Sequence, residues 1–282
     1  TAAGRAPQGA WFEDITAKAG VAAKHTNRSF QNPYAHIMEG YTALGAAAAV
    51  ADYNGDGFED IFVTDSKDGG KNRLYRNNGD LTFTDVAAQA GVADGNDDAN
   101  ASADALWFDS NNDRRPDLFV VRFGRSQLFQ NLGNGRFRDV TRRAGLDRYA
   151  NAITAIAFDY DRDGFADLFV GSYFQPVNIF QPDTVRFFPE SFETANNGGG
   201  VTVYRNNGNG TFTDVTAKVG IRLNGWTLDL GHADADNDGD DDLYVAADFG
   251  TDRFFVNNGD GTFTDATESA IGCDDQLCLA VV

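Results

Sequence analysis

The Asp/Asn pattern of the segment Asp52-Tyr-Asn-Gly-Asp-Gly-Phe-Glu-Asp60 recurs three more times in this chain of 282 residues, in copies that begin at Asp109, Asp159 and Asp234. Each copy carries side-chain oxygens at positions 1, 3, 5 and 9, a spacing at which a tight turn can wrap one hard cation, calcium above all. Carboxylates packed this closely repel one another in a partly desolvated turn, and a divalent cation removes that repulsion. With position 7 counted as well, the candidate metal ligands are Asp52, Asn54, Asp56, Phe58, Asp60, Asp109, Asn111, Asp113, Arg115, Asp117, Asp159, Asp161, Asp163, Phe165, Asp167, Asp234, Asp236, Asp238, Asp240 and Asp242.

The EF-hand begins with a similar loop but needs a bidentate glutamate at position 12 and a helix on either side. Position 12 is a valine in all four copies, and each loop runs directly into a strand-like segment of apolar residues. These two features exclude EF-hands. Surface turns of Asp, Asn and Gly that hold no metal remain the alternative interpretation.

The second loop departs from the other three. Arg114 replaces the glycine that eases the sharp turn, and Arg115 and Pro116 follow it. A cationic side chain beside a cation site lowers the affinity of that site. The sequence therefore predicts three to four Ca²⁺ ions, with the occupancy of the second loop left open.

Each Asp loop belongs to a longer repeat. An apolar strand precedes it, in residues 44–51, 105–108, 153–158 and 228–233, and three further strands with a Gly-rich turn follow it. The first aspartates of successive loops are 57, 50 and 75 residues apart, which is compatible with the blades of a propeller that carry insertions. We predict an all-β fold, a β-propeller with four-stranded antiparallel blades. A solenoid of the same units is the alternative.

Several strings resemble FG-GAP or VCBS repeats, which occur in integrin α-subunit propellers and in the cartilage acidic protein family. The resemblance rests on the four Asp loops, on strings such as Tyr204-Arg-Asn-Asn-Gly-Asn-Gly-Thr-Phe-Thr-Asp-Val215, and on Tyr34-Ala-His-Ile-Met-Glu-Gly-Tyr-Thr-Ala-Leu-Gly45. It implies a calcium-stabilised β-propeller, usually of seven blades, that acts in binding or adhesion.

The two ends of the chain depart from this family pattern. Residues 11–16 match only the last strand of a blade, and residues 278–282 match only a first strand. We expect a flexible leader in residues 1–10 and one propeller domain in residues 11–282. This domain is either part of a larger propeller or a smaller ring closed by both termini.

The formal net charge of −19 argues against nucleic acid and anionic membranes as partners. No apolar run is long enough to cross a bilayer, so membrane insertion is not expected. Weak calcium sites fill at the calcium levels found outside cells, which favours a secreted, extracellular or periplasmic location. Cys273 and Cys278 allow either a local disulfide, which fits export, or two free thiols.

In antiparallel blades, the long link before the first blade and the insertion in the third repeat fall on the face opposite the Asp loops. The aromatic residues of the insertion, beside amide side chains, suit a glycan or protein ligand, although they also suit packing of the insertion onto the sheet. His25, His36 and Glu39 share the long link, where a second metal site or a general base is conceivable, and His232 is expected to face the core. The candidate residues of this ligand face are His25, His36, Glu39, Phe174, Phe180, Phe187 and Phe188.

Together these patterns favour an extracellular calcium-binding β-propeller that serves as a recognition, adhesion or structural module for a glycan or protein of the cell surface or matrix. The alternative is a lyase or hydrolase that acts on polysaccharide through the face opposite the Asp loops. The sequence contains no Gly-x-Ser-x-Gly, no phosphate-binding glycine loop and no His-Glu-x-x-His, and it assigns no catalytic residue.

Overall fold

The computed structural model describes residues 12–36, 39–40, 46–181 and 188–270, and the four repeats form four sets of strands in this part of the chain. The expected leader, both cysteines and Phe187 lie outside the described residues. The first set is β1 (Ala48–Ala51), β2 (Asp60–Val63), β3 (Arg73–Asn77) and β4 (Phe83–Asp85). The second is β5 (Ala101–Phe108), β6 (Asp117–Arg125), β7 (Gln127–Asn131) and β8 (Phe137–Asp139). The third is β9 (Tyr149–Phe158), β10 (Asp167–Phe174), β11 (Gly200–Asn206) and β12 (Phe212–Asp214). The fourth is β13 (Thr227–Ala233), β14 (Asp242–Ala247), β15 (Arg253–Asn257) and β16 (Phe263–Asp265).

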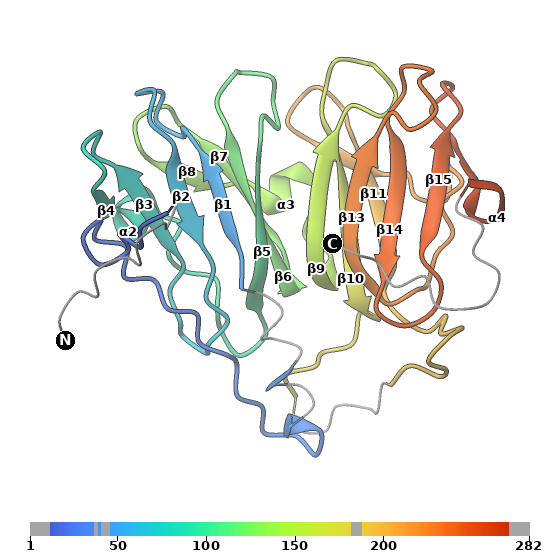
Figure 1. Cartoon of the computed structure of the whole chain (residues 1–282), viewed down its shortest axis with the longest axis horizontal. Helices are drawn as coiled ribbons and strands as arrows, with labels where there is room; N and C mark the ends of the chain where they lie inside the picture. Colours follow the sequence, from blue (N-terminus) through green and yellow to red (C-terminus); the bar gives the residue numbers. More distant parts are fainter. Residues whose placement is uncertain (1–11, 37–38, 41–45, 182–187, 271–282) are drawn as a thin grey trace.

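Within each set, every strand pairs antiparallel with the next strand along the chain. The sets fan out side by side, with β1, β5, β9 and β13 along the inner edge (Figure 1). Short pairing of β6 with β9, at Phe123 and Asn151, joins the second and third sets into one larger sheet. The fold is therefore all-β and propeller-like, as the repeat pattern predicts.

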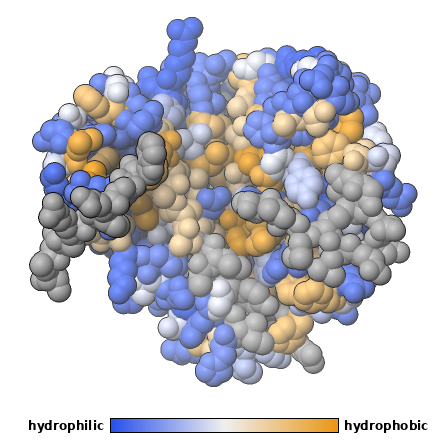
Figure 2. Space-filling model, viewed as in Figure 1, coloured by the Kyte–Doolittle hydropathy of each residue, from blue (hydrophilic) through white to orange (hydrophobic). Residues whose placement is uncertain are grey.

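The apolar core lies between neighbouring blades. Phe169 of β10 is fully buried, stacks on Phe158 of β9 at 4.5 Å between ring centroids, and meets Phe263 of the next blade edge-on at 6.1 Å. Burial of one such ring contributes about 1.5–3 kcal/mol. Apolar residues also gather in the middle of the face shown in Figure 2, over the inner strands, whereas the upper rim is hydrophilic.

A one-turn helix follows the last strand of the first, second and fourth sets: α2 (Ala87–Ala90), α3 (Thr141–Ala144) and α4 (Thr267–Ala270), of which α2 and α3 lead into the next blade. The first two end at glycines in the left-handed region, Gly91 (φ 85°) and Gly145 (φ 81°). A Cβ at Gly145 would lie 3.0 Å from the carbonyl oxygen of Phe212 in the following blade. Glycine thus serves both the reversal of the chain and the close approach of the blades.

A buried asparagine at the end of the third strand ties each blade to the one before it. Asn131 Nδ2 donates to the carbonyl of Tyr53 in the preceding Asp loop (2.7 Å) and to that of Pro116 in its own loop (3.1 Å). Asn206 and Asn257 repeat this arrangement with the preceding loops, at 3.0 and 2.9 Å. We call these three residues the asparagine clamps.

The long link before β1 and the insertion between β10 and β11 pack against each other. Both lie at the end of the blades opposite the Asp loops (Figure 1). Asn32 Nδ2 donates to the carbonyl of Ile179 (3.2 Å), and the rings of Phe30 and Phe180 stack at 5.8 Å between centroids. The strand order thus places these segments where the sequence predicts. No helix among the described residues combines the length and apolar character needed to cross a membrane.

The clamps yield a stability prediction. Asn131→Ala leaves two carbonyls without their amide donor, including the one in the preceding blade, and should lower the free energy of unfolding by about 3 kcal/mol. Asn77 makes the same bond within its own repeat, to Glu59, so Asn77→Ala should cost about 1 kcal/mol. Urea denaturation measures both. Equal losses in the two variants would show that the bond between blades contributes nothing.

Candidate metal centre

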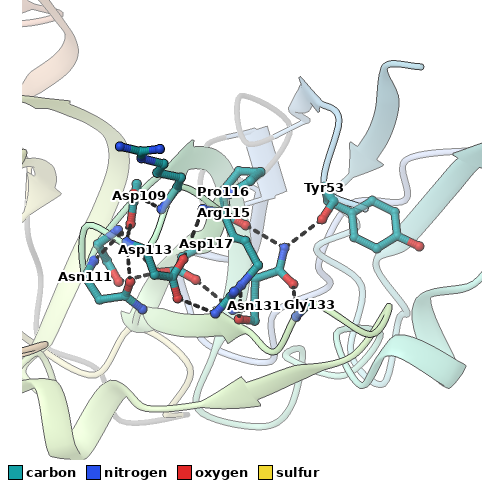
Figure 3. Close-up of polar contacts among 11 residues, drawn as sticks. Tyr53, Asp109, Asn111, Asp113, Arg115, Pro116, Asp117, Asn131 and Gly133 are labelled. Carbon is teal, nitrogen blue, oxygen red and sulfur yellow. Dashed lines mark hydrogen bonds and ion pairs between the residues drawn. The ribbon is translucent and has the colours of Figure 1, made fainter. Parts of the chain in front are cut away.

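Each Asp loop is curled by its own carboxylates. In the second loop, Asp109 accepts the backbone N–H of Asp113 on Oδ1 (3.1 Å) and that of Arg114 on Oδ2 (2.6 Å), and Asp113 accepts that of Arg115 (3.0 Å) (Figure 3). The third loop repeats these three bonds with Asp159 and Asp163 as acceptors. The acidic side chains at positions 1 and 5 therefore accept backbone N–H groups of their own loop.

Position 9 has a second role that the sequence pattern does not show. The carboxylate of Asp167 is fully buried and accepts the N–H of the clamp Asn206 on Oδ1 (2.7 Å) and that of Tyr160 on Oδ2 (3.3 Å). Burial raises the pKa of Asp167 to about 7, and it raises the pKa of Asp60 and of Asp117 to about 6. These aspartates hold the loop, the second strand and the third strand together, whether or not they also contact a metal.

In the third and fourth loops, three carboxylates converge. One oxygen from each of Asp159, Asp161 and Asp167 lies within 4.8 Å of the others, and the same holds for the first three aspartates of the fourth loop, Asp234, Asp236 and Asp238. Asp161 Oδ1 is buried and has no hydrogen-bond partner. Hard divalent cations are bound by such sets of carboxylate oxygens, so the residues present fit calcium.

Among the described residues, arginines contact carboxylates of three of the four loops, the fourth loop through Arg162 and Asp240. Arg205 Nε donates to Asp161 Oδ2 and its Nη2 donates to Asp163 Oδ2, both at 2.6 Å. The hydrogen bond to Asp161 raises the pKa of Arg205 above its usual value. In the second loop, Arg115 pairs with Asp113 at 2.5 Å (Figure 3). These guanidinium groups partly offset the repulsion among the carboxylates.

The second loop is strained where the sequence predicts. Position 6 adopts the left-handed region in all four loops, with φ of 86°, 90° and 91° at Gly57, Gly164 and Gly239. Arg114 occupies the same position with φ 66°. A side chain in this region costs about 1–2 kcal/mol relative to glycine. The expectation that this loop is the least favourable of the four thus has a structural basis.

Position 7 fixes the loop to the turn between the third and fourth strands. The ring of Phe58 lies against Gly79, and that of Phe165 lies against Gly208, where a Cβ would approach the ring within 2.8 Å. In the fourth loop, the buried Asp240 pairs instead with Arg162 of the preceding Asp loop. The side chains at position 7 therefore pack the loops, and their backbone carbonyls remain the candidate metal ligands.

The structure corrects the assignment of Phe174 to the ligand face. Its ring is 1% exposed and packs against Phe123 and Trp226 at 6.2 and 5.4 Å between centroids. Phe174 belongs to the core because the end of β10 runs between two blades. Phe180 stacks on Phe30 and lies 4.7 Å beneath the guanidinium of Arg28, and Phe188 meets Tyr34 edge-on. These rings attach the insertion to the long link.

The histidines lie in different surroundings. His25 Nε2 lies 3.4 Å from Ser66 Oγ, His36 is exposed, and neither joins Glu39 in a group of metal-ligating side chains among the described residues. A general base in this link stays a prediction. His232 does not face the core: it is exposed, stacks flat on Phe158 at 4.5 Å and pairs with Asp241 at 2.7 Å.

The position-9 carboxylate gives a prediction that needs no metal. Asp167→Asn places an amide NH₂ against one of two backbone N–H donors and should lower the free energy of unfolding by about 2–3 kcal/mol in excess chelator. Asp94→Asn, at an exposed carboxylate paired with Lys71, should change it by less than about 1 kcal/mol. Chemical denaturation with chelator present compares them. A neutral Asp167→Asn would contradict the structural role of position 9.

Comparison with known proteins identifies the repeats. A family model described as FG-GAP-like repeat matches residues 52–120, 109–170, 192–245 and 234–281, so the matches together span most of the chain. Each match includes at least one Asp loop, and together the matches cover all four loops. No curated protein matches the chain.

Two solved structures are similar in part. A lectin from Agrocybe aegerita, described as recognising non-reducing terminal N-acetylglucosamine, is 20% identical with a TM-score of 0.43, over 78% of this chain and 51% of that one. The exotype rhamnogalacturonan lyase YesX is 15% identical with a TM-score of 0.37, over 77% of this chain and 45% of that one. The chain spans about half the length of these structures.

Proposed function

The chain belongs to the FG-GAP-like repeat family, and we propose that it is an extracellular calcium-binding module in which Ca²⁺ in the Asp loops stiffens the blades for recognition or adhesion. The convergence of three carboxylates in each of the third and fourth loops carries this proposal. The unpartnered, buried Asp161 Oδ1 supports it, because a buried anionic oxygen without a donor or a cation is costly.

Calcium in these loops would act on the whole blade. The ion would be held by positions 1, 3, 5 and 9 together with the carbonyl of position 7, and when bound it supplies positive charge to carboxylates that otherwise repel one another. Position 9 begins the second strand and also binds the asparagine at the end of the third. A cation on this carboxylate therefore stabilises the strand pairing as well as the loop.

The proposed partner is a glycan or a protein of the cell surface or matrix, bound on the face opposite the Asp loops. The insertion exposes the ring of Phe192 there: Phe192 is 67% exposed and meets Phe249 edge-on at 5.5 Å. Exposed rings beside amide groups suit both sugars and peptides. The proposed extracellular location follows from the calcium requirement, since multi-oxygen sites of modest affinity fill at extracellular calcium concentrations.

A calcium titration of the thermal melt tests the metal. Binding to the folded state alone adds about 2.7 kcal/mol per site at one hundred times Kd, which raises Tm by roughly 5–10 °C in a domain of this size. The double variant Asp236→Asn/Asp238→Asn keeps the hydrogen-bond acceptors of the fourth loop but removes two charges, so part of this rise should disappear.

The matched control is Asp94→Asn/Glu193→Gln, which removes two exposed charges outside the Asp loops. Its calcium-dependent rise in Tm should equal that of the unmodified chain. A melt that does not respond to calcium after removal of prebound metal would refute the proposal. An identical response in both double variants would refute the fourth loop as a site.

A further inference from the structure

Positive charge is concentrated in one blade of this acidic chain. Residues 114–148 contain nine arginines and three aspartates, and no lysine or glutamate, although the net charge of the whole chain is −19. The segment comprises β6, β7, β8 and α3 with their connections, and so makes up most of the second blade. An isolated basic region on an acidic protein attracts anions locally while the rest of the surface repels them.

Five of these arginines line one open cavity of about 670 Å³, within the usual size range of small-molecule sites. The cavity lies outside the Asp loops, where β6 turns into β7 and where β8 runs into α3. The arginines that line it are Arg122, Arg125, Arg138, Arg142 and Arg143.

The other repeats show that the fold does not require these arginines. Position 138 aligns with Thr84, Thr213 and Thr264 in the shared Phe-x-Asp string. Four residues further on, Arg142 aligns with two alanines and a glutamate, and Arg122 of the second strand aligns with Asp65, Ser172 and Ala247. Blades of the same design thus form without a guanidinium at any of these positions, so structure alone does not explain their presence.

Arg122 is a buried cation that pairs with no carboxylate in the part of the chain that the structure describes. Its side chain is 5% exposed, Nη1 donates to the carbonyl of Gly95 (2.7 Å) and Nε donates to that of Arg125. No ion pair among the described residues includes it. Burial lowers the pKa of Arg122 to about 10. Buried charges are normally paired, so a site beside this group favours an anion.

The two carboxylates of the cavity are already engaged. Asp139 accepts bonds from Gln127 (3.0 Å) and from the Thr141 hydroxyl (2.6 Å), and Asp147 pairs with Arg125 at 3.2 Å. No ion pair of the described residues joins Arg138, Arg142 or Arg143 to a carboxylate. All three are exposed, so the cavity has guanidinium donors available for a ligand.

We propose that this cavity of the second blade binds an acidic saccharide, a unit of about one or two sugars that carries carboxylate or sulfate groups. The guanidinium groups recognise the anionic substituents. The neutral polar residues of the lining, Asn100, Ser126, Gln127 and Thr141, match the hydroxyl groups of a sugar. The site is separate from the Asp loops and does not depend on their binding calcium.

Nucleic acid fits this cavity less well, although it is also anionic. No aromatic side chain of the described residues lines the cavity, so bases would find no ring there to stack on. The phosphate backbone of a longer strand would also meet the acidic surface around the second blade. A short acidic ligand avoids both problems.

Isothermal titration calorimetry at fixed calcium tests the proposal with four probes. Digalacturonate carries carboxylates, a heparin-derived disaccharide carries sulfates, maltose is neutral, and an oligothymidylate of five nucleotides represents nucleic acid. We expect one of the two acidic saccharides to bind with an affinity that falls as the salt concentration rises, and maltose not to bind. The acidic probe that binds identifies the anionic group.

The variants use exposed arginines, because Arg122 also holds two backbone carbonyls and its replacement would disturb the turn between β6 and β7. Arg138→Gln/Arg142→Gln should raise the Kd of the binding saccharide at least about tenfold through loss of two charge-assisted contacts. Arg136→Gln/Arg222→Gln removes the same charge from exposed arginines outside the cavity and should change Kd by less than about twofold. Unchanged thermal melts confirm that both double variants are folded.

Four results would overturn the proposal: no binding of either acidic saccharide at about 10 mM, equal binding of maltose, equal weakening by both double variants, or undiminished binding by Arg138→Gln/Arg142→Gln. Tighter binding of the oligothymidylate, lost in Arg138→Gln/Arg142→Gln, would replace the saccharide with nucleic acid as the ligand of this cavity.

Discussion

The buried aspartate at position 9 of each loop connects three levels of this structure. Asp117 is fully buried, and its carboxylate receives N–H groups from Ser110 within the loop and from Asn131 at the end of β7. Asn131 in turn reaches the carbonyl of Tyr53 in the preceding blade. One short series of hydrogen bonds thus constrains the conformation of the loop, the pairing of the second and third strands, and the distance between blades. The apolar rings between blades contribute hydrophobic burial, which is non-directional, whereas these hydrogen bonds are directional and constrain the register.

This arrangement places carboxylates in the protein interior, where the ionised form is less stable than in water. Burial raises the pKa of Asp60, Asp117 and Asp167, which means that the ionised carboxylates are less stable there than in water. In the third and fourth loops, further carboxylates from positions 1, 3 and 5 lie close together. Arg205, Arg115 and Arg162 compensate for part of the charge in three of the loops, and the proposed calcium would compensate for the rest. On this account the main role of the metal is to stabilise the fold, and other surfaces of the blades bind the partner.

The sequence predicts the local features well, and the features between blades poorly. Strand order, loop placement and the strain at Arg114 follow from patterns within one repeat, and the structure bears them out. Phe174 and His232 differ from the sequence prediction because their surroundings come from neighbouring blades: the first is buried between them, and the second stacks on Phe158 of the previous blade. The recurrent asparagine was visible as a repeat, yet its role depends on a carbonyl 78 residues away for Asn131. The arginine-lined cavity likewise needs β6, β8 and α3 in their final places.

The most direct test of calcium as the organising ion is a crystal structure grown with calcium, with anomalous differences used to locate the metal. The account predicts peaks inside the third and fourth loops, beside Asp161 and beside Asp236, with position 9 still bonded to the asparagine of the third strand. Calcium-saturated crystals that show no anomalous peak in either loop, with Arg205 still paired to Asp161 and Asp163, would contradict it.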